Sequence, residues 1–142
     1  MIVIFNKKAR CPWTEKDVKK MIDFAARAAR VSGNVEVNVI GEKLIKKLNF
    51  QYRGVDKVTD VLSFAWLEDK VVKAENIGEI YLCHKRIVRQ AREFGVSPKE
   101  EFTRILIHGF LHLLGYDHQT KNQAVKMFGL QEAVVKKFKK VL

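Results

Sequence analysis

One short segment constrains this chain more than any other. It reads HGFLHLLGYDH from His108 to His118 and holds three of the four histidines in the sequence. An α-helix has about 3.6 residues per turn, so His108 and His112 lie one turn apart on the same face, where both imidazoles can reach a common ion. His118 cannot share that face. The helix must therefore end before it, and Gly115 tolerates the left-handed conformation that ends helices. The segment predicts a helix that stops beside a three-histidine metal site.

Three imidazole ligands leave one position open on a tetrahedral zinc ion, which is the arrangement of catalytic zinc sites. Imidazole also binds nickel, copper and iron, so the ligands favour Zn²⁺ without excluding those metals. The spacing H-x-x-x-H-x-x-G-x-x-H is that of the metzincin proteases, but their second position is a glutamate that serves as general base. Here that position is Gly109, so a protease would lack its base. His84 has no partner at ligand spacing and is interpreted as a packed histidine.

Length and charge limit the class of protein. The chain has 142 residues, which suits a single domain over residues 1–142. Its formal net charge of +11 favours a polyanionic partner, nucleic acid before an anionic membrane. Most of the lysines and arginines are nevertheless expected on solvated helix faces.

Cys11 and Cys83 have no paired spacing, and the apolar start of the chain is too short for a signal peptide or a membrane span. We therefore expect a cytoplasmic protein with no disulfide-linked partner.

The hydrophobic pattern predicts the order of elements. Strands are expected at 1–5, 35–40, 61–66 and 77–83, and helices at 14–32, 44–52, 84–94, 98–114 and 120–142. Residues 56–60 form a loop, and Val71 and Val72 could belong to a hairpin between the last two strands. The predicted fold class is α+β: a single domain with a small mixed β-sheet of about four strands, about five helices, and a zincin-like metal site at the end of a helix.

A second motif lies upstream of the histidines. The run LNFQYRGVDKVTDVLSF from Leu48 to Phe64, read together with His108–His118 and with Gly78-Glu79-Ile80, closely resembles the YbeY family of bacterial endoribonucleases. The likeness covers nearly the whole chain. The family usually has proline where this chain has Val58 and Ala65, and this difference concerns only local loop rigidity.

The resemblance implies a function. The resemblance implies that the three histidines bind zinc and that Arg53 is important beside the metal. The implied activity is cleavage of single-stranded RNA in 3′-end maturation of small-subunit (16S) rRNA and in ribosome quality control. The implied partners are single-stranded RNA, rRNA and the small ribosomal subunit.

The chemistry of single residues suggests roles without deciding them. Arg53 is the candidate catalytic and substrate-binding residue, because a guanidinium can hold two phosphate oxygens, although it could also pair with Asp56 or Asp60 on the surface. Ser63, on the strand at 61–64, could donate to a phosphate, or this strand could serve packing alone. Asp117 could orient an imidazole or merely end the helix.

RNA binding and the chemical step each admit two interpretations. Tyr52, Trp66 and Tyr116 could stack on bases or pack in the core. The attacking oxygen could come from metal-bound water or from the 2′-hydroxyl of the RNA. Two further functions stay open: a zinc hydrolase of the metalloprotease type, and a non-catalytic ribosome-binding assembly factor whose zinc is structural.

Overall fold

The computed structural model describes residues 1–66 and 76–141. Within these ranges the chain forms four strands and five helices, as predicted; the hairpin proposed around Val71 and Val72 lies outside the described residues. In chain order the elements are β1 (Ile2–Lys7), α1 (Glu15–Ala29), β2 (Asn34–Val39), α2 (Glu42–Arg53), β3 (Val61–Ala65), β4 (Asn76–Leu82), α3 (His84–Phe94), α4 (Pro98–Leu113) and α5 (Lys121–Val141).

Local sequence signals explain where helices begin and end. Thr14 caps α1 and forms a capping box with Asp17. The helix ends at Ala29, earlier than the pattern indicates, because Arg30 adopts the left-handed conformation with φ 57°. Ser97 caps α4, and Pro98 occupies its first turn, as predicted from the sequence.

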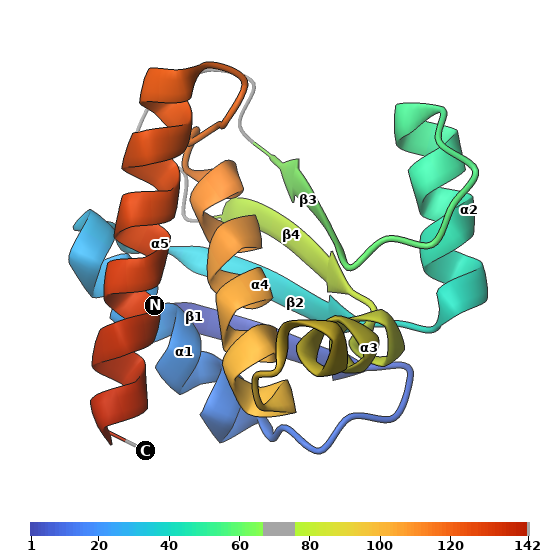
Figure 1. Cartoon of the computed structure of the whole chain (residues 1–142), viewed down its shortest axis with the longest axis horizontal. Coiled ribbons are helices and arrows are strands. Elements are labelled where there is room, and N and C mark those ends of the chain that lie inside the picture. The colour runs from blue at the N-terminus through green and yellow to red at the C-terminus, as the bar shows by residue number, and fades with distance from the viewer. Residues whose placement is uncertain (67–75, 142) are drawn as a thin grey trace.

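The sheet has the order β1-β2-β4-β3. Strands β1, β2 and β4 are parallel, and β3 runs antiparallel to β4 along one edge, so the sheet is mixed as predicted. In Figure 1, α1, α4 and α5 lie in front of the sheet, and α2 stands beside β3. The fold is α+β.

Two apolar clusters pack against the sheet. The larger one joins α1, α3, α4 and α5 to the buried valines and isoleucines of β1, β2 and β4. The smaller one joins Ile45 of α2 to Leu62 of β3, together with Ile40 and Cys83. Side chains alternate along β3, so Leu62 faces α2 while Val61 and Ser63 face α4. The edge strand therefore contributes to both layers.

Helix α4 approaches the sheet closely at Gly109. A Cβ atom at this position would lie 2.9 Å from Val61 Cγ2, 3.0 Å from Ser63 Oγ and 3.2 Å from Ile80 Cγ2. The Ser63 hydroxyl donates a hydrogen bond of 2.8 Å to the Gly109 carbonyl oxygen. The absence of a side chain at residue 109 thus sets the distance between α4 and β3, and with it the depth at which His108 sits.

Among the described residues, no helix combines the length and the apolar character that crossing a membrane would require.

Candidate metal centre

The three histidines predicted to lie together do so. His108 and His112 project from the last turns of α4, and His118 follows in the next loop. One nitrogen of each ring lies within 4.8 Å of the others, and the two Nε2 atoms of His108 and His112 are 3.1 Å apart. Two nitrogens on one tetrahedral zinc ion are separated by about 3.3 Å, given Zn–N bonds of about 2.0–2.1 Å. The cluster could therefore hold one metal ion.

The end of α4 brings His118 back toward the helix. The amide of Tyr116 donates to the carbonyl of Leu111 (3.1 Å) and that of Gly115 donates to the carbonyl of His112 (3.1 Å), which together form a Schellman motif. Gly115 has φ 95°, so the predicted left-handed residue is confirmed. The Asp117 carboxylate accepts from the backbone N–H of His118 at 2.7 Å. Asp117 thus fixes the loop that carries His118, and this bond engages the backbone of His118 rather than its ring.

Two contacts to His108 come from α5, the helix that follows α4 in the chain. Nδ1 of His108 lies 2.7 Å from Oε1 of Gln131, which belongs to α5 and is 5% exposed. The Phe128 ring, on the same helix, stacks on His108 with centroids 5.8 Å apart and planes inclined by 19°. The sequence motifs point to neither residue. Gln131 lies 23 positions from His108, so no local pattern could indicate the pairing.

Burial is the main reason that the pKa values of His108 and His112 lie below the ordinary histidine value. The neighbouring imidazoles add to this, because a positive charge on one ring disfavours a positive charge on the next. Both rings are therefore neutral near neutral pH, and neutral imidazole is the form that binds metals.

These lowered pKa values predict how the stability of the metal-free protein depends on pH. Below about pH 6.5 the histidines of the unfolded chain take up protons while His108 and His112 in the folded chain resist, so the free energy of unfolding falls as the pH decreases. We expect a smaller decrease in the double variant His108→Gln/His112→Gln. Urea denaturation between about pH 7.5 and about pH 5.5 measures both slopes; parallel slopes would contradict the prediction.

The histidines open into a cleft of about 1220 Å³. Its walls come from α2, β3, α3, α4 and α5, and both other predicted site residues, Arg53 and Ser63, line it. Arg53 is exposed in the last turn of α2, where Gly54 ends the helix in the left-handed conformation. Asp56 pairs with Lys46 (Nζ–Oδ1 3.9 Å) and Asp60 accepts from Gln90 (3.1 Å), so in the described part of the chain neither acid is paired with Arg53. Arg53 therefore does not form the surface ion pair with Asp56 or Asp60 that the sequence left open.

The other side chains proposed to contact RNA lie in three different surroundings. The Ser63 hydroxyl already donates its proton to the Gly109 carbonyl oxygen. Donation from Ser63 to a phosphate stays a prediction, and it would require this hydrogen bond to break. Tyr52 lines the cleft and packs on Phe64 with centroids 4.9 Å apart. Trp66 instead donates to Glu79 (3.1 Å), and Tyr116 packs against the main core.

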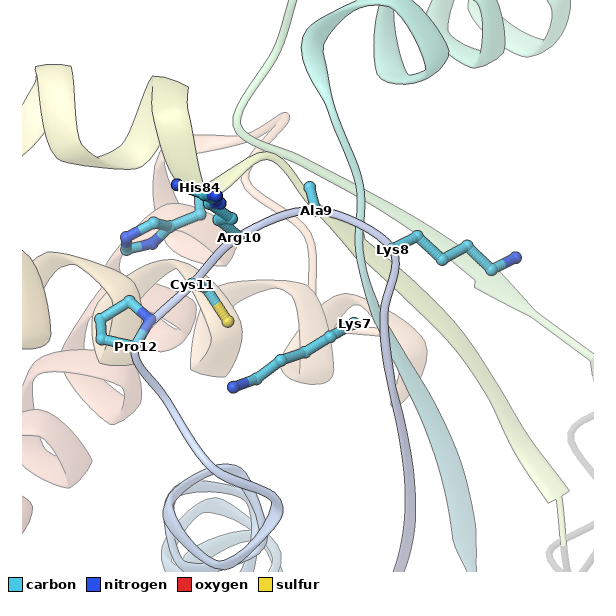
Figure 2. A pocket seen from close by; sticks show the side chains of 7 residues that line it. All are labelled: Lys7, Lys8, Ala9, Arg10, Cys11, Pro12 and His84. Carbon is cyan, nitrogen blue, oxygen red and sulfur yellow. The ribbon is translucent and has the colours of Figure 1, made fainter.

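A second hollow lies away from the histidine cluster, at the end of β1. Figure 2 shows that Lys7 and Lys8 on its rim point in different directions, so their amines do not converge on one point. His84 borders this hollow and packs against Trp13 and Phe102, with centroids 5.8 and 5.9 Å away. The interpretation of His84 as a packed histidine fits these contacts.

The fold and the cleft define a small α+β protein in which three histidines at the end of a central helix could hold a metal ion. Comparison with known proteins identifies the family. The model of the family described as "Endoribonuclease YbeY" matches residues 4–139. The chain belongs to this family of RNA-cleaving enzymes, as the sequence motifs indicated.

Individual relatives carry the name of the same family. The endoribonuclease YbeY of Moorella thermoacetica is 40% identical over 145 residues, covering 93% of each protein, and that of Malacoplasma penetrans is 38% identical over 140 residues, covering 95% of this chain and 92% of the relative. The Ureaplasma urealyticum protein of the same name is 41% identical over 100 residues, and the match spans 70% of this chain and 64% of that relative. The solution structure of TM1509 from Thermotoga maritima superposes with a TM-score of 0.66 at 31% identity, covering 95% of this chain and 87% of that one.

Proposed function

We propose that this protein is a zinc-dependent endoribonuclease that cuts single-stranded RNA. The observation that carries the proposal is the convergence of three ligand nitrogens within 4.8 Å, in a cleft that Arg53 also lines. His108, His112 and His118 would hold the ion. Their neutral nitrogens form the donor set that zinc accepts with one position left open. When bound, the ion supplies Lewis-acid assistance at the scissile phosphate.

Residues of this chain would supply the other contacts to the RNA. Cleavage of a phosphodiester builds negative charge on the phosphate oxygens, and Arg53 can bind two of them with its guanidinium. The exposed position of Arg53 at the end of α2, without a competing carboxylate from Asp56 or Asp60, leaves its donors available to a substrate. Tyr52, exposed on the same wall, offers an aromatic face to an unpaired base.

We further propose that the biological substrate is small-subunit (16S) rRNA, cut in 3′-end maturation and in ribosome quality control in the cytoplasm, with the small ribosomal subunit as partner. The net charge of +11 supports binding to a large polyanion. The charge supports a ribosome-binding assembly factor with a structural zinc equally well. The distinction between these two functions therefore rests on cleavage.

The close approach at Gly109 argues against a metalloprotease. A glutamate at this position would direct its side chain into β3 and β4, where even a Cβ meets three side chains at 3.2 Å or less. The general base of the metzincin motif is thus missing, and the packing leaves no room for one at this place.

The test of the proposed function compares three substrates under one condition. Purified protein is incubated with a single-stranded RNA, with the same RNA annealed to its complement, and with an unfolded protein. We expect cleavage of the single strand, slower cleavage of the duplex, and an intact polypeptide. Cleavage of the polypeptide alone would support a hydrolase of the metalloprotease type. RNA binding without cleavage would support the assembly factor.

Arg53→Lys tests the phosphate contact. Lysine keeps the charge but not the paired geometry, so we expect a loss of about 1.5–3 kcal/mol of transition-state binding, or about 10- to 150-fold in kcat/KM. The control is Arg27→Lys, at an exposed position on α1 outside the cleft. Equal rates for both variants would remove Arg53 from the proposed mechanism.

A further inference from the structure

We infer that Gln131 is a positioning residue, which holds His108 with Nδ1–H toward α5 and leaves the Nε2 lone pair directed at the metal. This inference rests on the proposed metal site. It adds to that site a residue that contacts no ion itself and acts through one ligand.

The contact has the geometry of a strong hydrogen bond. Gln131 Oε1 lies 2.7 Å from His108 Nδ1, on a side chain that is 5% exposed and sits where α5 packs on α4. The half-buried imidazole has a hydrogen-bond partner at Nδ1, and Gln131 supplies it. On the other edge of the same ring, Nε2 faces Nε2 of His112 at 3.1 Å. The Nδ1 edge of the His108 ring therefore contacts Gln131, and the Nε2 edge faces the histidine cluster.

The direction of the Gln131 amide follows from its other neighbour. The amide Nε2 donates to Oε2 of Glu132 at 3.0 Å. A carboxylate only accepts hydrogen bonds, so the NH₂ end of the amide must face Glu132 and the oxygen must face His108. A reversed amide would place two acceptors together at Glu132 and lose the bond between Gln131 and Glu132.

Glu132 is itself held in place. The Arg104 guanidinium binds it in a bidentate manner, with Nε to Oε2 at 2.9 Å and Nη2 to Oε1 at 2.9 Å. The remaining Nη1 of Arg104 donates to Glu100 at 3.1 Å and to Glu101 at 3.2 Å. A chain of hydrogen bonds thus runs from Arg104 through Glu132 and Gln131 to His108, and it joins α4 to α5 beside His108.

The consequence is a defined tautomer. A neutral imidazole carries one N–H, and an acceptor at Nδ1 places it there, which leaves Nε2 free to bind a metal. Partners of this kind fix the ring orientation of metal-binding histidines, and their loss typically lowers metal affinity by about 10- to 100-fold. The sequence motif identifies the three histidines, but only the helix pairing shows what orients the first of them.

The test uses Gln131→Met, which keeps the volume and removes the acceptor, and Gln131→Glu, which keeps an acceptor. Zn²⁺ affinity is measured by competition with a chromophoric chelator. We expect Gln131→Met to bind Zn²⁺ about 10- to 100-fold more weakly than the wild type. Gln131→Glu keeps an acceptor for His108 but loses the donor to Glu132, so we expect it to bind Zn²⁺ more tightly than Gln131→Met. Leu130→Met, one residue away on α5, controls for altered helix packing and is expected to keep the wild-type affinity.

A second readout needs no metal. The ¹⁵N shifts of the His108 ring in the metal-free protein report which nitrogen carries the proton. We expect Nδ1–H in the wild type and a shift away from that tautomer in Gln131→Met. Unchanged Zn²⁺ affinity and unchanged ring shifts in Gln131→Met would overturn the inference. If the wild type binds no Zn²⁺, the proposed metal site fails, and the ring shifts alone then decide whether Gln131 sets the tautomer.

Discussion

His112→Ala is expected to lose RNA cleavage almost entirely, with a rate about 10³-fold or more below that of the wild type. The ring of His112 supplies one of three nitrogens within 4.8 Å, and two ligands alone would hold a metal ion only weakly. Loss of about 4 kcal/mol of charge stabilisation by the ion corresponds to this factor. A time course on single-stranded RNA, with both proteins prepared identically, measures it.

The matched control is the fourth histidine. His84 lies in the other hollow, packed against Trp13 and Phe102, and does not line the cleft. His84→Gln should therefore cleave RNA at nearly the wild-type rate once its folding is verified by circular dichroism. Equal cleavage by His112→Ala and the wild type would indicate that the activity does not arise at the histidine cluster.

Gly109→Ala is expected to destabilise the protein, although alanine is the better helix former. The added Cβ would lie 2.9 Å from Val61 Cγ2 and 3.0 Å from Ser63 Oγ, so α4 must move away from β3. Overpacking of this kind costs about 1–3 kcal/mol, which exceeds the gain of about 1 kcal/mol in helix propensity. Urea denaturation gives the free energy of unfolding. Because Gly109 sets the depth of His108, we also expect weaker Zn²⁺ binding.

Gly129 provides a control with the opposite sign. It lies exposed on α5, and a Cβ there would meet nothing within 4 Å. Gly129→Ala should raise the free energy of unfolding by about 0.5–1 kcal/mol. If both substitutions stabilise the protein, the close approach of α4 to the sheet does not constrain residue 109.

The elements that the sequence predicts correctly have short-range causes. The capping box of Thr14 and Asp17, Ser97 before Pro98, and the left-handed Gly115 are all set by residues within one or two turns. The grouping of His108, His112 and His118 follows from helix periodicity and a helix stop. These features can be predicted from the sequence because a few neighbouring residues determine them.

The features that sequence patterns miss depend on contacts between elements. Gln131 and Phe128 reach the cluster because α5 folds back along α4, and Ser63 bonds to Gly109 because β3 lies against that helix. In the sequence, Gly109 indicates only that a general base is missing. The structure adds the physical reason for a glycine at this position, which is the close contact of α4 with β3 and β4. The pattern places the end of α1 too late because Arg30, a residue not typical of helix ends, takes the left-handed conformation.

The most direct test of a metal-dependent nuclease is a titration of the metal-free protein. Chelator-treated protein is mixed with single-stranded RNA, Zn²⁺ is added stepwise, and both bound metal and cleavage rate are recorded. We predict no cleavage at the start and a rate that rises to a plateau at one ion per chain. Full-rate cleavage by the metal-free protein, or one bound ion per chain without cleavage, would contradict the proposal.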